Sequence, residues 1–346
     1  MDKGTRRVPE GGGKVSSVGL RALKILYIII FVVSALIVVG YCYMTYGVRP
    51  PTVEEPPAPV DSMQPVESDP LDTGEPEPAE PALVRRDQVY TCLIFGMDDG
   101  NGNTDTIMVA AFDVPNQKIG LMSIPRDTVV RLDRSPKSWN KINAAYADGG
   151  VEQMDKELEE LLGIPIDYYI KIRLSAFQKL VNAIDGVWFD VPVNMNYEDP
   201  YQDLYIHINK GYQFLNGEQA MQVVRYRQSN TDDSYGDTGR AGTQQAFMKA
   251  MLSQVLSGAS VGTIPELVDV LLNYVETDAD TNAMLYFGRE ALGIDLDTAL
   301  STGTLPAEWH SPYMWVQKDE ALAMINELLN PYTTEITEDM VEFFQR

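Results

Sequence analysis

The sequence predicts an α/β domain with a central mixed β-sheet flanked by helices, placed behind one N-terminal transmembrane helix. Three observations support this fold class: an uncharged apolar run near the N-terminus, a proline-rich acidic segment after it, and alternating strand-like and helix-like segments from residue 84 onward. With 346 residues and 45% hydrophobic content, the chain is long enough to bury a large core once the tails are set aside.

The apolar run covers residues 25–48 and contains no charged side chain, so it can cross the roughly 30 Å hydrocarbon layer of a bilayer. A cleaved signal peptide is the alternative, but the run is longer than a usual signal-peptide core and no small-x-small pattern follows closely. Lipid attachment at Cys42 is disfavoured, because Tyr41 stands where a small residue is expected. Lysines and arginines gather in residues 1–24, which the positive-inside rule places in the cytoplasm. We therefore expect a single-pass protein of the cell membrane with an extracellular C-terminal domain.

The segment after the apolar run, residues 49–83, is predicted to be a solvated stalk. Residues 50–81 hold ten of the 21 prolines, interleaved with acidic residues and with few large apolar side chains. Proline-rich chain extends by about 3.1 Å per residue, so this stalk can hold a domain up to roughly 100 Å from the bilayer.

Short apolar or β-branched runs bounded by turn residues predict strands at 90–95, 106–112, 118–124, 168–172 and 187–191. Apolar positions at three-to-four spacing predict helices at 151–162, 175–184, 216–224, 241–256, 266–274, 282–292 and 319–329, with Gly163 ending the first. Because no linker interrupts these elements, we expect one folded domain over residues 84–332 and a C-terminal tail over 333–346.

Composition excludes several classes of function. The net charge of −23 argues against nucleic acid as a partner, because such binding needs a basic surface that displaces counterions. The two cysteines, Cys42 and Cys92, are not expected to form a disulfide, and the two histidines show no zinc-ligand spacing. Any anion that binds this acidic chain must meet a local cluster of basic side chains.

Two polar segments are predicted at one edge of the sheet. The first is a Gly- and Asp-rich loop over residues 96–105, which places carboxylates at a strand end; alone, such a loop is usually a turn. The second is Ser123-Ile-Pro-Arg-Asp127, which follows a buried strand, so that Pro125 restricts the backbone and Arg126 lies at the same edge. A lone arginine there is more often a salt-bridge partner.

A third segment places three arginines within sixteen residues. Asn216 and Gln219 form a predicted helix cap, and Arg225 and Arg227 lie two residues apart, which suggests that this helix ends near Val224.

The next helix carries Arg240 and Gln244, which are four residues apart. If it begins near Gly239, the two share one face of its first turn, where backbone N–H groups and the helix dipole favour an anion. The alternative is that the arginines neutralise nearby aspartates at 232, 233 and 237.

Together with Lys141-Ile-Asn-Ala-Ala-Tyr146, these segments resemble the LytR-CpsA-Psr family in order and approximate spacing, over about residues 88–330. The resemblance implies a phosphotransferase that attaches a polyprenyl-pyrophosphate-linked glycopolymer, such as teichoic acid, capsule or a related wall polymer, to N-acetylmuramic acid of peptidoglycan. No motif identifies the polymer, the general base or the residues that hold the lipid.

The resemblance also implies roles for individual residues. Asp98 and Asp105 would hold Mg²⁺, which takes one or two carboxylates and completes its shell with water and substrate phosphates. Asp127 would orient Arg126 within a catalytic set of Arg126, Asp127, Arg225 and Arg227. The residues that would bind the pyrophosphate are Arg126, Arg225, Arg227, Arg240 and Gln244. Asn103 and Thr243 stand where many members carry arginine.

Two rival interpretations remain at this point. Ser138-x-x-Lys141 fits one element of penicillin-binding serine enzymes, but the Ser-Asp-Asn and Lys-Thr-Gly elements that accompany it there are absent from the sequence. The other rival is a non-catalytic envelope-binding or regulatory protein that holds lipid-linked polymer. Turnover of a labelled donor separates this rival from an enzyme.

Overall fold

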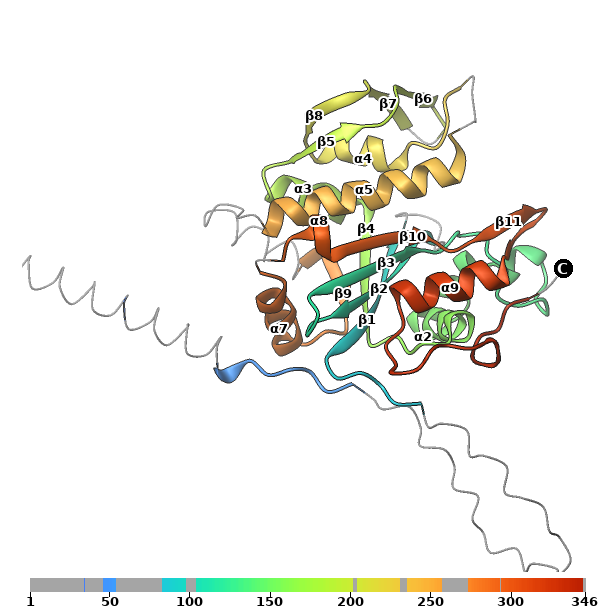
Figure 1. Ribbon diagram of the computed structural model, residues 1–346. Helices are drawn as coiled ribbons and strands as arrows, with labels where there is room; N and C mark the ends of the chain where they lie inside the picture. The colour runs from blue at the N-terminus through green and yellow to red at the C-terminus, as the bar shows by residue number, and fades with distance from the viewer. Residues whose placement is uncertain are drawn as a thin grey trace, which may run out of the picture. The chain divides into compact units, whose positions relative to one another are not determined.

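A six-stranded mixed sheet forms the centre of the larger of two compact units, residues 1–49 and 50–346 (Figure 1). The computed structural model describes residues 34, 46–53, 83–97, 104–201, 204–230, 235–256, 273–292 and 294–344. Strands run in the order β10-β3-β2-β1-β4-β9, with parallel pairs β10–β3 and β1–β4 and the others antiparallel. The predicted central mixed sheet is thus confirmed. Its strands are β1 (Val89–Met97), β2 (Thr104–Asp113), β3 (Lys118–Ser123), β4 (Tyr168–Arg173), β9 (Val275–Thr277) and β10 (Leu300–Thr304).

Helices cover both faces of this sheet, because side chains along each strand alternate between two apolar surroundings. On one face, Leu93 and Phe95 of β1 pack with α2 (Ile142–Leu162) and α9 (Lys318–Leu328) in the main core. The other face is covered by α3 (Leu174–Ala183), α5 (Gly236–Leu256) and α7 (Thr281–Ala291). Tyr90 contacts the rings of Tyr286 and Phe287 on α7. Short helices are also present at Lys137–Asn140 (η2), Leu296–Ala299 (α8) and Glu338–Met340 (η3).

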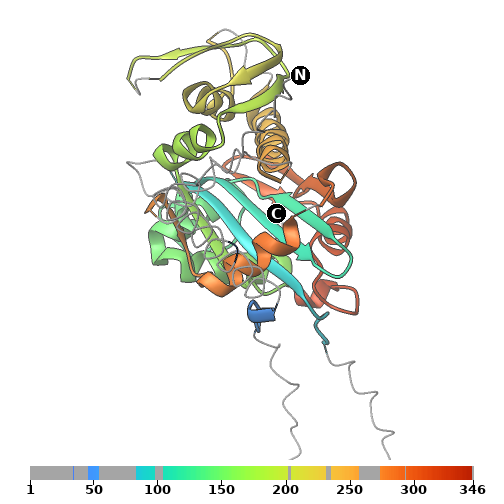
Figure 2. The same cartoon turned by 90° about the vertical axis from the view of Figure 1, so that its left-hand side faces the viewer.

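A second core lies beyond α5, between α4 (Gly217–Arg225) and two antiparallel strand pairs (Figure 2). One pair joins β5 (Val187–Val191) to β8 (Gly211–Leu215), and the other joins β6 (Met195–Asp199) to β7 (Leu204–Ile208). Their inward side chains, such as Phe189 and Ile206, are buried against the helices. A third hairpin, β11 (Ala307–His310) and β12 (Tyr313–Val316), follows β10.

Most predicted elements are present, with changes at their ends. The helix predicted from Val151 begins nine residues earlier, because α2 continues through a kink at Gly149 and Gly150. Gly163 ends it as predicted, in a left-handed conformation (φ 67°) with its N–H bonded to the Glu159 carbonyl. Residue Ile336, within the segment predicted as a tail, is buried in the main core.

Other predictions lie largely outside the described residues. The helix expected at 266–274 is described only at its last two positions, and the transmembrane helix expected at 25–48 only at residues 34 and 46–48. No helix of the described part is both long and apolar enough to cross a membrane. The anchor therefore stays a prediction.

Asp155 on α2 gives the fold a measurable pH dependence. Its Oδ1 is buried and has no hydrogen-bond partner among the described residues. Burial, with Glu159 and Asp278 nearby, raises the pKa of Asp155 to about 7. The pKa of an aspartate in the unfolded chain is about 3.9, so between pH 4 and pH 7, roughly, the folded state holds a proton that the unfolded state has lost. The free energy of unfolding therefore falls as pH rises through this range.

We therefore expect Asp155→Asn to remove part of the stability loss between pH 5 and pH 8, measured as the change in thermal midpoint. Glu152→Gln is the matched control, because Glu152 lies on the same helix and is exposed. An unchanged pH profile in Asp155→Asn would show that this carboxyl is not the group that titrates.

Candidate functional site

The segment after β3 is fixed by hydrogen bonds to β2 and β12 and by one bond within its own turn. The N–H of Ile124 donates to the Ile107 carbonyl on β2 (2.8 Å), and the N–H of Thr128 donates to the Pro125 carbonyl within the turn (2.9 Å). The Asp127 carbonyl accepts from the N–H of Met314 on β12 (2.8 Å). Arg126 and Asp127 are therefore held on a rigid turn at the end of the central sheet.

This turn also caps α2. The first N–H groups of a helix lack partners within the helix, and here the residue before the helix, Lys141, makes no side-chain cap bond. Instead, the N–H of Ile142 donates to the Thr128 carbonyl (2.9 Å) and that of Asn143 to the Arg126 carbonyl (3.1 Å). Backbone hydrogen bonds thus join the two sequence motifs, Ser-Ile-Pro-Arg-Asp in the turn and Lys-Ile-Asn-Ala-Ala-Tyr at the start of α2.

Asp127 lies between two cations. Its Oδ1 is 2.7 Å from Nζ of Lys141, while its Oδ2 is 3.9 Å from Nε of Arg126. The ammonium of Lys141 also lies 5.9 Å from the centre of the Trp309 ring. Sequence reasoning placed Asp127 beside Arg126, and the structure adds Lys141 as its nearer partner.

The helical layer supplies the other basic side chains. Helix α4 ends at Arg225, one residue beyond the prediction, and Tyr226 is extended, so Arg227 lies on the connection that follows. The predicted cap is confirmed: Asn216 and Gln219 bond reciprocally in a capping box.

Helix α5 carries Arg240 and Gln244, but it begins at Gly236, because the N–H of Gly239 already bonds to the Tyr235 carbonyl (3.0 Å). The expectation that Arg240 lies in the first turn is therefore wrong. The Nε2 of Gln244 donates to the Val224 carbonyl near the end of α4 (3.0 Å), which joins the two helices.

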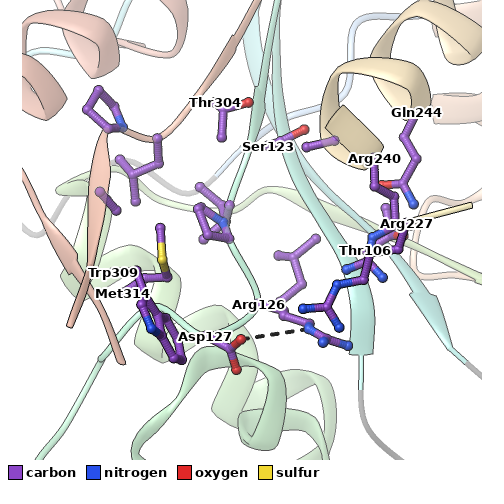
Figure 3. A pocket seen from close by; sticks show the side chains of 17 residues that line it. Thr106, Ser123, Arg126, Asp127, Arg227, Arg240, Gln244, Thr304, Trp309 and Met314 are labelled. Carbon is purple, nitrogen blue, oxygen red and sulfur yellow. Dashed lines mark ion pairs between the residues drawn. The ribbon is translucent and has the colours of Figure 1, made fainter. Parts of the chain in front are cut away.

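These elements enclose a cavity of about 570 Å³. In Figure 3, Arg126, Arg227 and Arg240 gather on one side of it, opposite Trp309 and Met314. Its lining carries three arginines and one aspartate in a chain of net charge −23, so it concentrates positive charge. The lining residues are Thr106, Ile107, Ser123, Ile124, Pro125, Arg126, Asp127, Arg227, Arg240, Ala241, Gln244, Thr304, Leu305, Pro306, Ala307, Trp309 and Met314.

A second, mostly apolar cavity of about 90 Å³ adjoins the first, since Thr106 and Gln244 line both. It lies between the sheet and the helices α3, α4 and α5. Apart from Arg173, Thr106 and Gln244, its lining is apolar: Ile94, Phe95, Gly96, Met108, Ile172, Phe177, Val224, Phe247 and Met248. A ligand with an anionic group and an apolar chain could occupy both.

The structure does not bring all the predicted site residues together. Arg225 is half-buried and does not line the cavity, and Thr243 is buried beside Tyr235, to whose hydroxyl it is hydrogen-bonded. Asp98, Asn103 and the side chain of Asp105 lie outside the described residues. The described residues contain no group of three or more metal-ligating side chains.

Sequence reasoning gave no role to several residues that shape the site. Gln245 ties α5 to the sheet, since its Nε2 donates to Ser123 Oγ (2.8 Å) and to the Gly303 carbonyl (2.6 Å). Trp309 comes from a short hairpin far along the chain, and no local motif marks it. In the sequence, Gln245 could have been singled out only because it directly follows Gln244.

Fold and site together define an α/β domain in which an arginine-lined cavity adjoins an apolar one. A comparison with family models matches the LytR_cpsA_psr family over residues 62–330. The chain belongs to this family.

Relatives and solved structures agree with the assignment. The chain is 31% identical to the polyisoprenyl-teichoic acid–peptidoglycan teichoic acid transferase TagV of Bacillus subtilis (strain 168), over 55% of this chain and 49% of TagV, about half its length. It is 29% identical to the TagU transferase of Bacillus mycoides (strain KBAB4), over 75% of this chain and 81% of TagU. The crystal structure of B. subtilis TagV superposes with a TM-score of 0.60 at 25% identity, covering 70% of this chain and 96% of TagV.

Proposed function

We propose that this protein is a membrane-anchored, magnesium-dependent phosphotransferase that moves a glycopolymer from a polyprenyl pyrophosphate carrier to N-acetylmuramic acid of peptidoglycan. The observation that carries the proposal is the arginine-lined cavity that adjoins an apolar one, since the donor joins a pyrophosphate to an isoprenoid chain. The names of TagV and TagU, which are teichoic acid transferases, support the same reaction class.

In the proposed reaction, the 6-hydroxyl of a muramic acid residue attacks the phosphorus that carries the polymer. A new oxygen–phosphorus bond forms, the bond to the bridging oxygen breaks, and polyprenyl phosphate leaves with that oxygen while the hydroxyl gives up its proton. Arg126, Arg227 and Arg240 would stabilise the charge that spreads over the phosphate oxygens, because guanidinium groups suit phosphate geometry and are already in position. Gln244 and Lys141 would position the elements that carry these arginines. Arg225 would have a structural role, since α4 ends at this residue and the chain then leads to Arg227.

Mg²⁺ would be held by Asp98 and Asp105. The pairing of Met97 with Thr104 closes the β1–β2 loop, of which Asp98 is the first residue, while Asp105 follows Thr104 on β2 and the next residue, Thr106, lines the arginine cavity. Hard oxygen ligands next to a phosphate site fit the preference of this ion. When bound, the metal would supply Lewis-acid stabilisation of phosphate oxygens.

The first isoprene units of the carrier would enter the apolar cavity beside Thr106 and Gln244. Residues 25–48 would anchor the chain in the membrane, and residues 49–83 would let the domain reach from the bilayer to the wall.

A second candidate function is a non-catalytic role in holding lipid-linked polymer. It is favoured by a relative of 29% identity over 71% of this chain and 73% of its own length, which bears the name regulatory protein MsrR, from Staphylococcus aureus (strain COL). Both candidates require donor binding, so they differ in turnover alone.

The deciding experiment follows a radiolabelled lipid-linked glycopolymer in the presence of purified peptidoglycan and the full-length protein in detergent. The enzyme hypothesis expects label to enter the insoluble wall fraction with release of polyprenyl phosphate. Donor binding without transfer under several metal conditions would favour the non-catalytic role instead.

Removing a predicted metal ligand tests the magnesium assignment. Asp105→Asn should abolish the magnesium dependence of donor binding, because the ion loses a direct carboxylate ligand while the side chain keeps its size. Calorimetric titrations of donor with and without Mg²⁺ measure this effect, and Asp133→Asn, at an exposed aspartate, is the control. If Asp105→Asn retains the wild-type response to Mg²⁺, Asp105 is not a ligand.

A further inference from the structure

A cluster of exposed aromatic side chains covers the outer face of the strand pair β5–β8. Trp188 is 53% exposed, Tyr212 70% and Phe214 44%. The rings of Trp188 and Tyr212 are stacked, with centroids 5.5 Å apart and an interplanar angle of 19°, and Phe214 contacts Trp188 edge-on at 5.7 Å. We call these three residues the aromatic platform.

Strand geometry explains why the platform faces outward. Val187 and Phe189 point into the second core, so the alternate positions Trp188 and Asp190 face away from it. Trp188 pairs with Phe214 across the ladder, and Tyr212, two residues before Phe214 on β8, pairs with Asp190 and is the diagonal neighbour of Trp188. The strands β5 and β8 lie beyond α4 and α5 from the central sheet (Figures 1 and 2). Because Val187 and Phe189 face the second core, the platform lies on the outer side of these strands.

Stabilisation of the strand pair does not by itself account for the platform. A cross-strand aromatic pair stabilises a strand pair by roughly 0.2–1 kcal/mol, and this stabilisation needs only two rings. Here a third ring extends the group and is the most exposed of the three. Clustered exposed aromatic surface is typical of a binding face rather than of an inert one.

The charges around the platform limit what can bind there. Asp190 and Glu198 take outward-facing positions of β5 and β6, and the exposed Lys210 lies in the turn before β8, so this face carries a net negative charge. An anionic bilayer, an anionic polymer or a second copy of this acidic chain would meet like charge on this face. An uncharged, hydroxyl-rich ligand would meet acceptors for its hydroxyl protons instead.

We propose that the aromatic platform binds the uncharged sugar backbone of a glycan strand. The apolar C–H face of a β-linked hexosamine ring stacks on Trp188 and Tyr212, and Asp190, on the same face, accepts hydroxyl protons. The inference rests on the proposed function, because it gives the acceptor polymer a second contact, remote from the phosphate site, that keeps the strand on the enzyme.

Chitohexaose, a soluble oligomer of β-1,4-linked N-acetylglucosamine, is the probe, and calorimetric titration of the full-length protein in detergent is the measurement. We expect the wild type to bind it, and both Tyr212→Ala and Trp188→Ala to weaken binding by about tenfold. Tyr212→Ala is the safer variant for folding, since its ring is the more exposed. Tyr201→Ala, at a fully exposed tyrosine in the turn after β6, is the matched control and should bind normally.

Two further measurements separate the outcomes. Donor binding should be unchanged in Tyr212→Ala, so failure of the proposed function, seen as absent transfer by the wild type, is distinguishable from failure of the platform. Absence of chitohexaose binding, or binding that survives both substitutions, overturns the inference. So does Tyr212-dependent binding to anionic lipid vesicles or Tyr212-dependent dimerisation.

Discussion

Arg126→Ala should lower the rate of polymer transfer by about 10²–10³-fold, the usual cost of removing a preorganised donor aimed at developing charge. The thermal midpoint should change little, because the 3.9 Å contact with Asp127 is a loose, partly exposed ion pair worth about 0–1 kcal/mol. The backbone carbonyl of residue 126 still caps α2 in the variant, so the turn keeps its shape. Transfer assays and thermal melts on the same preparation measure both effects.

Arg289→Ala is the matched control, since Arg289 on α7 pairs with Glu290 at 2.6 Å and does not line the cavity. It should transfer polymer at the wild-type rate. Wild-type transfer by Arg126→Ala would show that Arg126 is a structural partner of Asp127 and that the pyrophosphate lies elsewhere.

Gly120→Ala should cost about 3 kcal/mol or more of the free energy of unfolding, at the upper end for an overpacked core site. A Cβ on Gly120 of β3 would lie 1.8 Å from the carbonyl oxygen of Leu328, so the end of α9 would have to move off the sheet. The carbonyl of Leu328 belongs to the backbone, so it cannot move aside as a flexible side chain can. Urea denaturation of the full-length chain measures the loss.

Gly288→Ala serves as the comparison. A Cβ there meets no described atom within 4 Å, and Gly288 lies inside α7, so alanine should raise stability by about 0.5–1 kcal/mol. If Gly120→Ala unfolds at the same urea concentration as the wild type, α9 does not pack on β3 as closely as the structure shows.

The sequence predicted the four middle strands of the central sheet but not its edge strands β9 and β10, and of the strands in the outer layer it predicted only β5. The strands at β1, β2, β3 and β4 are long, apolar and bounded by turn residues, and each appears within two residues of its predicted limits. By contrast, β6 (Met195–Asp199) and β7 (Leu204–Ile208) alternate buried and exposed positions over only five residues each. Such short alternations do not exceed the background of loop sequence, and the burial of β7 depends on its packing against α4, which no pattern within the strand reports.

The site was predictable to the extent that local motifs carry it. Arg126, Arg227, Arg240 and Gln244 line one cavity, although the sequence separates the first from the last by more than a hundred residues. The ends of helices were predicted less accurately. Because α5 begins at Gly236, Arg240 lies beyond its first turn. Trp309 could not be found from sequence, because its place depends on how the β11–β12 hairpin packs on the turn at Asp127.

The arginine cavity is built from parts of two separate hydrophobic cores. Arg126 belongs to the sheet layer, whereas Arg227 and Arg240 belong to the layer organised around Phe247 and α4. An anion held by all three therefore acts as a cross-link between the cores, and by mass action its binding energy opposes any opening of the outer layer. An anion bound in the arginine cavity would in this way also make the face that carries the aromatic platform more rigid.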